Sequence, residues 1–236
     1  MPKHRSYLEP FFGSGGVLFN KPPAWLETIN DLDGEVVNFF RVCRSKPDEL
    51  ANSLALTPWS REERNAAYTP AEDELEQARK FAVKCWQTIW AFPDKARGWR
   101  YTTGQNLNSG PKNVSQWAKL PDRIRAAAER LLEVQIENRP ALDVIRRFNG
   151  AEVLIYADPL YIRKTRTACG NLYTYEMTDA DHTELLTALL DHQGMVMLSG
   201  YDNELYNDML SGWRKETRTT QAERGAKRVE CLWMNI

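Results

Sequence analysis

The stretch RSYLEPFFGSGGVLFNK (5–21) decides the fold of this protein, because three kinds of local structure follow one another in it. Residues 5–12 predict a short strand that runs into a turn. The glycines within residues 13–16 predict the turn itself, since glycine allows a tight bend and lets a ligand approach the backbone closely. Residues 17–21 then predict the start of a helix.

The residues that follow extend this pattern into an α/β fold. LETIND (26–31) predicts a second strand, and GEVVNFFRVCR (34–44) has its apolar residues at helical spacing. A strand, a glycine turn, a helix, a second strand and a second helix open an α/β fold with parallel strands.

The same alternation returns in the second half of the chain. A helix is predicted over 178–194, with Thr178 as its N-cap, Asp181 at the third helical position and Gly194 at its end. Further strands are predicted at 134–138, 151–159, 195–201 and 229–235.

Between these two parts lies a helical region of different character, residues 57–129. Its first long helix is predicted from TPAE (69–72), a capping signature with Thr69 as N-cap, and is expected to run to about Trp90. The predicted division is therefore a frame of residues 1–56 and 130–236 with an insertion of residues 57–129.

Composition limits the classes of protein that this chain can represent. Its 236 residues suffice for one large domain, or for one domain with a smaller one inserted. The four cysteines form no CxxC pair and do not cluster with the three histidines, so neither a disulfide framework nor a metal site is expected. No apolar run reaches the roughly 20 residues that span a bilayer, and no signal peptide is present. We expect a soluble cytoplasmic protein.

Charge is distributed unevenly along the chain. Residues 79–125 hold ten basic and two acidic side chains, a net +8, so the remainder carries −9 of the formal total of −1. The same window holds four tryptophans, and basic residues interleaved with aromatic ones suit a polyanion with stackable bases. The alternative is a solvated helix face whose tryptophans form a local core.

A first candidate site combines the glycine turn with Asp31 at the end of the second predicted strand. An acid there can accept hydrogen bonds from ribose hydroxyls, as in dinucleotide folds. The turn is not GxGxxG and no lysine follows it as in a P-loop, so a nucleoside without a diphosphate, such as S-adenosylmethionine, fits best. The alternative is an ordinary tight turn with a helix-capping Asp.

A second candidate site is YADPLY (156–161), which ends a predicted strand. Methylation of an exocyclic amine on a base needs two hydrogen-bond acceptors, which localise the nitrogen lone pair. Asp158 can supply a carboxylate, the Pro159 carbonyl the second acceptor, and Tyr161 a ring that stacks on the base. The alternative is a strand that ends in an ordinary Asp-Pro turn.

With these motifs the chain resembles the Dam-type adenine-specific DNA methyltransferases. YLEPFFGSGGVLFNK, INDLD, YADPLY, LSGYDNELY and ECLWMN occur in the order of that family, whose catalytic motif reads DPPY. The resemblance implies a Rossmann-like methyltransferase fold with a mixed central sheet, and methyl transfer from S-adenosylmethionine to the exocyclic amine of adenine. It implies catalytic roles for Asp158, Pro159 and Tyr161, and cofactor contacts for Glu9, Pro10, Phe11, Gly13, Ser14, Gly15 and Asp31.

The resemblance also implies a DNA partner. Residues 57–129 fall where the family carries its target-recognition region, and a duplex adenine must be flipped out to reach Asp158. We expect a monomer that binds double-stranded DNA. The candidate DNA contacts are Arg97, Arg100 and Lys112 in the insertion, and Arg163, Lys164 and Arg166 beside the catalytic motif.

Two departures from the family pattern bear on activity. The family carries an upstream segment with GGK that helps hold the cofactor, whereas this sequence opens at MPKHRSYLEP, which predicts weaker cofactor binding. Leu160 stands where the family has its second proline; leucine frees the backbone angle φ and adds an N–H donor. That donor disturbs the target amine if it points inward and is harmless if it points into the strand. We predict reduced rather than absent chemistry.

Two other readings stay open from the sequence. The chain can be a non-catalytic DNA-binding remnant whose basic insertion still functions. It can also be a methyltransferase that acts on RNA or on a small molecule, a reading that the large basic insertion disfavours.

Overall fold

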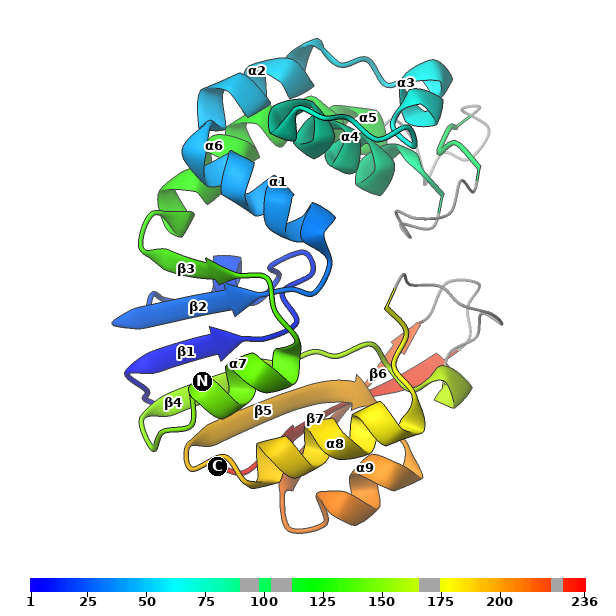
Figure 1. Cartoon of the computed structure of the whole chain (residues 1–236). Coiled ribbons are helices and arrows are strands. Elements are labelled where there is room, and N and C mark those ends of the chain that lie inside the picture. The colour runs from blue at the N-terminus through cyan, green and yellow to red at the C-terminus, as the bar shows by residue number, and fades with distance from the viewer. Residues whose placement is uncertain (90–97, 103–111, 166–174, 222–226) are drawn as a thin grey trace. The chain divides into compact units, whose positions relative to one another are not determined.

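The computed structural model describes residues 1–89, 98–102, 112–165, 175–221 and 227–236. Two compact units divide the chain: one holds Met1–Leu32 and the described residues from Val134 onward, and the other holds the described residues of Asp33–Glu133 (Figure 1). The second unit begins before residue 57, at which the sequence predicts the insertion to start. In the described part of the chain, no helix combines the length and apolarity needed to cross a membrane.

The first unit is built around a seven-stranded mixed sheet, which confirms the predicted α/β class with a mixed central sheet. Its order is β3-β2-β1-β4-β5-β7-β6, with β7 antiparallel to both of its neighbours and the other pairings parallel. The strands are β1 (Ser6–Glu9), β2 (Leu26–Asn30), β3 (Val134–Glu137), β4 (Val153–Ala157), β5 (Met195–Tyr201), β6 (Arg214–Gln221) and β7 (Lys227–Met234).

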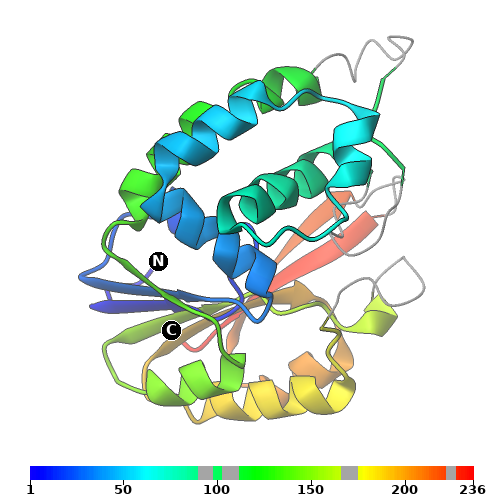
Figure 2. The same cartoon turned by 45° about the horizontal axis from the view of Figure 1, so that its top comes forward.

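Three helices cover one face of this sheet: α7 (Ala141–Arg147), α8 (Asp179–Leu190) and α9 (Glu204–Met209) (Figures 1 and 2). Side chains at every second strand position pack against them, as the alternation of a strand requires. The fully buried members of this core include Leu8, Ile155, Leu198 and Trp233. Each such side chain stabilises the unit by about 1.5–3 kcal/mol on burial.

The helix α8 forms where the sequence predicts it and for the predicted reason. Thr178 accepts a hydrogen bond from the backbone N–H of Asp181, and the Asp181 carboxylate accepts one from the N–H of Thr178. This reciprocal capping box satisfies two backbone donors at the start of the helix. The helix ends at Leu190, four residues before the predicted stop at Gly194.

Two predicted helix starts are wrong. The helix expected over 17–21 is only a short 3-10 helix, Leu18–Asn20. The helix expected to start after Thr69 is α4 (Glu74–Gln87), and its N-cap is Asp73, whose side chain accepts from the N–H of Glu76. Thr69 and Asp73 each precede an acidic residue by three positions, and the side chain that caps is the one nearer the apolar helical run.

The second unit is helical, with α1 beside α4 and α2 beside α6 (Figures 1 and 2). Its buried side chains include Phe40 from α1, Leu50 and Leu54 from α2, and Leu131 from α6. The helices besides α4 are α1 (Gly34–Ser45), α2 (Pro47–Leu56), α3 (Arg61–Ala66), α5 (Lys112–Trp117) and α6 (Leu120–Leu131).

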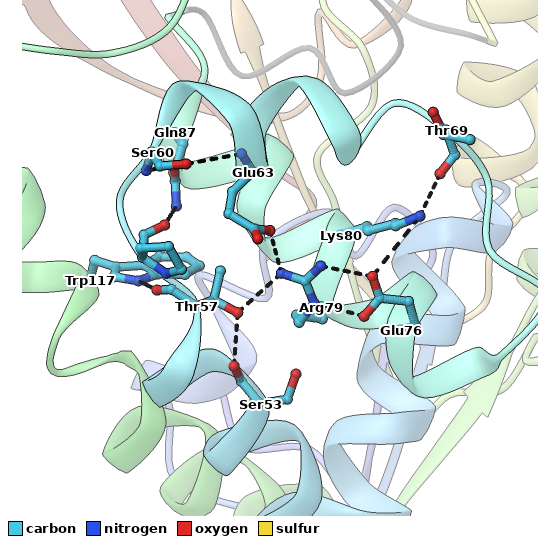
Figure 3. Close-up of polar contacts among 11 residues, drawn as sticks. Ser53, Thr57, Ser60, Glu63, Thr69, Glu76, Arg79, Lys80, Gln87 and Trp117 are labelled. Carbon is cyan, nitrogen blue, oxygen red and sulfur yellow. Dashed lines mark hydrogen bonds and ion pairs between the residues drawn. The ribbon is translucent and has the colours of Figure 1, made fainter.

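A polar network centred on Arg79 joins three segments of this unit (Figure 3). The Arg79 guanidinium donates to both carboxylate oxygens of Glu76 at 2.7 Å and to Glu63 of α3 at 2.7 Å. It also donates to the Thr57 hydroxyl at 3.1 Å, at the end of α2. The Thr57 carbonyl in turn accepts from the indole N–H of Trp117 at 2.9 Å.

These contacts explain part of the charge asymmetry of residues 79–125. Arg79 is engaged as above, Lys84 forms a partly buried ion pair with Glu35, and Arg125 pairs with Asp48. The rings of Trp86 and Trp117 meet edge to face, with Trp117 buried. For these residues the alternative interpretation, in which the tryptophans form a local core, therefore holds. Fewer basic side chains of residues 79–125 are left to bind a partner.

Candidate active site

The sheet order places a change of direction between β1 and β4. From β1 the chain runs outward through β2 and β3 on one side, and from β4 it continues to β5 on the other. In sheets of this kind, ligands bind beyond the carboxyl ends of the strands at that point. Glu9 ends β1, Asp31 follows β2 and Asp158 follows β4, so these predicted site residues gather at this edge.

The glycine turn has the backbone that its sequence predicts. Gly13 and Gly15 have φ angles of +50° and +71°, a region that side chains of other residues rarely adopt. A Cβ atom on Gly15 would lie 2.5 Å from ring carbons of both Phe12 and Phe19, so only glycine fits there. The N–H of Gly13 donates to Asp31 Oδ2 at 2.8 Å, which joins the turn to the end of β2.

Glu9 lies beneath this turn and is 2% exposed. It accepts a hydrogen bond from the Tyr7 hydroxyl at 2.8 Å and one from the backbone N–H of Leu18. Burial raises the pKa of Glu9 to about 7; these two hydrogen bonds lower it, and the negative charge of Asp158 raises it. Glu9 therefore joins the glycine segment to the sheet, and its pKa depends on the charge of Asp158.

A buried ion pair lies beside Glu9. Lys21 pairs with Glu27 of β2, and its ammonium group lies 4.3 Å from the centre of the Tyr7 ring. The backbone N–H of Ala24 donates to the same Glu27 carboxylate at 3.0 Å. Both ends of the segment between β1 and β2 are thus fixed to the sheet, which holds the glycine turn in place.

Asn30 is a residue of this site that the sequence analysis missed. Its side-chain amide donates to the carbonyls of Pro10 and Arg139, each at 3.0 Å, and accepts from the N–H of Arg139 at 2.9 Å. It thereby ties the loop after β1 to the loop after β3. The signal available was its place next to Asp31 at a strand end, but its partners are 20 and 109 residues away.

The remaining predicted cofactor residues occupy the same segment. Pro10 is buried, Phe11 is half-buried and packs against the core of the first unit, and Ser14 and Gly13 are exposed. The structure therefore brings together the seven residues named for the cofactor, with their accessible surface at the glycine turn.

At the end of β4, the carboxylate of Asp158 meets the neighbouring strand. The Ser199 hydroxyl of β5 donates to Asp158 Oδ1 at 2.6 Å and lies 3.2 Å from the carbonyl of Ala157. Burial by neighbouring protein raises the pKa of Asp158, although part of the side chain stays open to solvent. Hydrogen bonds with Ser199 and Tyr161 lower this pKa, and the charge of Glu230 on β7 raises it.

Tyr161 packs edge to face against Tyr201 of β5, with ring centres 4.5 Å apart and an interplanar angle of 70°. Pro159 is buried and Leu160 is half-buried between Pro159 and Tyr161. Ile162, 7% exposed, anchors the chain after Tyr161 in the core of the first unit. The three residues predicted for catalysis therefore lie together, and Ser199 and Tyr201 are contacts that the sequence analysis did not identify.

The candidate DNA contacts are spread over both units. Arg163 and Lys164 are exposed beside the catalytic motif, with Lys164 3.2 Å from Asp179. In the helical unit, the carbonyl of Arg100 accepts from the indole N–H of Trp59 at 2.9 Å. Arg97 and Arg166 lie outside the described residues, as does the side chain of Lys112.

Beside Arg100 lies a stack of aromatic rings that the sequence analysis did not single out. Trp99 and Tyr101 are stacked, with ring centres 5.5 Å apart and an angle of 14° between planes. The guanidinium of Arg61 lies 4.9 Å from the Trp99 ring centre and 5.7 Å from that of Tyr101. Tyr101 is 59% exposed, so the stack is accessible to solvent at this residue.

Two comparisons with known proteins agree with this arrangement. The sequence model of the family described as D12 class N6 adenine-specific DNA methyltransferase matches residues 1–225. The Type II methyltransferase M1.LlaDCHI of Lactococcus lactis subsp. cremoris is 24% identical over 245 residues, which covers 95% of this chain and 84% of that protein. Both similarities extend over the two compact units.

Proposed function

Since the chain belongs to the D12 class N6 adenine-specific DNA methyltransferase family, we propose that it methylates the exocyclic amine of a target adenine in double-stranded DNA, with S-adenosylmethionine as methyl donor. The observation that carries this proposal is that Asp158, bonded to Tyr161, follows β4 at the edge of the sheet where the glycine turn follows the neighbouring strand β1. The resemblance read from the motifs agrees with this family membership.

The glycine segment supports the choice of methyl donor. Gly13 and Ser14 expose their backbone where a nucleoside can approach, and Gly15 cannot carry a side chain. Asp31, fixed by the N–H of Gly13, offers the carboxylate that ribose hydroxyls need. S-adenosylmethionine supplies an electrophilic methyl group at such a site. Glu9, buried beneath, supports the segment in this proposal.

Asp158 is the group that acts on the target amine. The lone pair of an exocyclic amine is delocalised into the ring, so the amine is a poor nucleophile. An ionised Asp158 and the Pro159 carbonyl accept its two N–H bonds, which localises the lone pair and orients it for in-line attack. Tyr161 stacks on the adenine ring. No covalent bond to the protein is needed.

The target adenine reaches Asp158 only after it leaves the duplex, and this flipping costs a few kcal/mol of stacking and pairing. We assign the contacts that offset this cost to the helical region, residues 57–129, and to Arg163 and Lys164. In the helical region, Arg100 and the stack of Arg61, Trp99 and the exposed Tyr101 carry the features that suit phosphates and bases.

Duplex binding by a Tyr101→Ala variant tests this assignment. Loss of one base-stacking ring weakens DNA affinity by about ten-fold or more. Trp25→Ala is the matched control, because Trp25 is also an exposed aromatic residue, at 74% exposed, but stands just before β2, away from the carboxyl edge of the sheet. Equal affinity of both variants and the wild type would remove Tyr101 from the interface.

A DNA-binding remnant without catalysis is the alternative that Leu160 keeps open. Calorimetry with S-adenosylmethionine, combined with a salt titration of DNA binding, separates the two functions. Heat of cofactor binding together with a steep salt dependence supports the enzyme, and a steep salt dependence without cofactor heat supports the remnant. Competition between duplex DNA and RNA tests the third reading, an RNA methyltransferase. The proposal takes the enzyme as a monomer that acts where the DNA is, inside the cell.

A further inference from the structure

We infer that Ser199 and Tyr201 of β5 are positioning residues for the methyl-transfer site: Ser199 orients the Asp158 carboxylate, and Tyr201 holds the Tyr161 ring. This inference rests on the proposed function for its catalytic meaning. Its physical content, a strand that fixes two side chains of its neighbour, can be measured without any turnover.

The register of the sheet brings these residues together. β4 and β5 run parallel, with Ala157 paired to Leu198, so the next residues, Asp158 and Ser199, stand side by side. Ser199 and Tyr201 are two residues apart, and side chains at that spacing share one face of a strand. The same face therefore presents a hydroxyl to Asp158 and a ring to Tyr161.

The opposite face of β5 packs closely against two aromatic rings at Gly200. A Cβ atom on Gly200 would lie 3.3 Å from the Trp233 ring and 3.4 Å from the Tyr206 ring. Both of these rings are buried in the core of the first unit. Packing on the opposite face of β5 thus fixes the strand that carries Ser199 and Tyr201. This restricts the geometry of their contacts with Asp158 and Tyr161.

Ser199 leaves the carboxylate free to act. An ionised carboxylate has about four lone-pair sites. The Ser199 hydroxyl occupies one on Oδ1 at 2.6 Å, and the hydrogen bond from Tyr161 occupies another. Two sites remain for a target amine, in a plane that Ser199 fixes.

Leu160 makes the contacts of Ser199 and Tyr201 more important for the orientation of the site. A proline at this position would restrict the backbone between Pro159 and Tyr161. Leucine does not, so the direction of Tyr161 and Asp158 depends on neighbours outside the motif. The contacts from β5 are placed to supply that restraint.

Several other groups act on the Asp158 carboxylate. Glu230 on β7 raises its pKa, as does its burial, while Tyr161 lowers it. Asp158 in turn raises the pKa of Glu9 on β1 and of Tyr206 on α9 through its charge.

Tyr156 of β4 is the remaining titratable neighbour, and its pKa is raised by burial and by Asp158 and is lowered by a hydrogen bond with Ser199. Ser199 thus touches two groups of this cluster. Loss of its hydroxyl leaves the opposing influences of burial and Glu230 in place, so the pKa of Asp158 must rise.

Carbon-13 NMR titration of the Asp158 carboxyl group in the intact chain tests the Ser199 contact directly. Ser199→Ala is expected to raise the pKa of Asp158, and Ser199→Thr, which keeps the hydroxyl, is expected to restore it. Ser45→Ala is the control, because the Ser45 hydroxyl donates to the carbonyl of Arg41 on the exposed surface of α1. An unchanged pKa in Ser199→Ala, with the fold intact by circular dichroism, would overturn the assignment of Ser199.

Kinetics of methyl transfer give the second readout. Ser199→Ala is expected to lower kcat by about ten-fold, as for loss of a hydrogen bond to a charged group, and to move the acid limb of the kcat profile to higher pH. Ser199→Thr is expected to recover both. A rate and profile equal to the wild type would overturn the inference.

Tyr201 is tested by a split between KM and kcat. Tyr201→Phe keeps the ring and is expected to match the wild type, whereas Tyr201→Leu is expected to raise KM for DNA by several-fold, since Tyr161 loses its support. A Tyr201→Leu enzyme with unchanged KM would overturn this part. If the NMR shift is found but no variant, including the wild type, transfers methyl groups, the Ser199 contact stands and the proposed function fails.

Discussion

At the scale of single residues, Leu160 bears most directly on rate. It stands between Pro159 and Tyr161, where the family motif has a proline. The greater backbone freedom of leucine leaves the orientation of the neighbouring site residues less fixed. Leu160→Pro is expected to raise kcat by about two- to five-fold, because proline at a compatible position removes backbone freedom equivalent to about 0.4–1 kcal/mol. The gain stays small because Ser199 and Tyr201 already restrain the motif. Initial rates of methyl transfer measure it, and equal rates for both proteins would refute it.

Gly15 is the residue of the glycine turn that tolerates substitution least. Gly15→Ala places a Cβ atom 2.5 Å from two phenylalanine rings at a φ of +71°. We expect a loss of about 2–4 kcal/mol in the free energy of unfolding, from backbone strain and overpacking together. Gly13→Ala is the matched control, since its φ is also positive but no atom lies within 4 Å, and about 1 kcal/mol is expected. Equal losses in urea unfolding would contradict this account.

Glu9 makes stability depend on pH in a predictable direction. Its pKa is about 7 in the fold against 4.5 for an ordinary glutamate, so the folded chain holds a proton that the unfolded chain releases. The stability that Glu9 contributes is present below pH 4.5 and is lost as pH rises through 7, about 3 kcal/mol in all.

A Glu9→Gln variant has no such proton to lose. Between pH 5 and 8, its free energy of unfolding is expected to fall less than that of the wild type. The difference between the two proteins is expected to be about 3 kcal/mol. Urea titrations at several pH values measure the difference. The exposed Glu72→Gln control should follow the wild type, and a Glu9→Gln curve parallel to the wild type would show that Glu9 is ionised at low pH in the fold.

At the scale of elements, local sequence identified those whose start or pattern is marked by their own residues. The helix α8 carries a capping box in which both partners lie within four residues, and β5 was predicted with its bounds unchanged, at 195–201. The start of α4 was misplaced because Thr69 and Asp73 compete as caps and only packing decides between them. β6 was missed because its sequence, RKETRTTQ, is polar throughout and gains its place only by pairing with β7.

The Arg79 network gives an element-scale prediction for the helical unit (Figure 3). Arg79 joins α4 to α3 and to the end of α2, and its side chain is 15% exposed. Arg79→Ala leaves Glu63 and Glu76 without their cation, and we expect a loss of about 1–3 kcal/mol in stability.

Arg125→Ala is the matched control for Arg79→Ala, because Arg125 also pairs with a carboxylate in this unit but both partners are largely exposed. It is expected to cost less than about 1 kcal/mol. Tryptophan fluorescence during urea unfolding reports on this unit through Trp117, which is bonded to Thr57. Equal effects of the two substitutions would mean that the network does not stabilise the unit.

At the scale of the whole molecule, the parallel frame could be read from the sequence because strands and glycine turns alternate with helices, and the seven-stranded sheet agrees. Asp31 and Asp158 could be identified because each follows an apolar strand. The contacts of Asn30, Ser199 and Tyr201 could not, since their partners lie in loops that follow other strands, and only the order and register of the sheet bring them together.

The boundary of the helical unit shows the same limit. The sequence predicts it at residue 57, where composition changes, whereas the compact unit begins at Asp33. The helices α1 and α2 follow a strand of the frame directly, so composition gives no sign that they pack with α4 and α6. Packing between distant helices sets such a boundary, and local pattern does not record it.

We propose that this chain methylates adenine in DNA through Asp158. The most direct test of this proposal is the incorporation of a labelled methyl group from S-adenosylmethionine into unmethylated duplex DNA, followed by digestion to nucleosides. We expect label in N6-methyladenine with the wild-type chain, and a loss of about a hundred-fold or more with Asp158→Ala, which removes the acceptor of the amine hydrogen bond. Label that appears equally with Asp158→Ala, or label on another base, would contradict it.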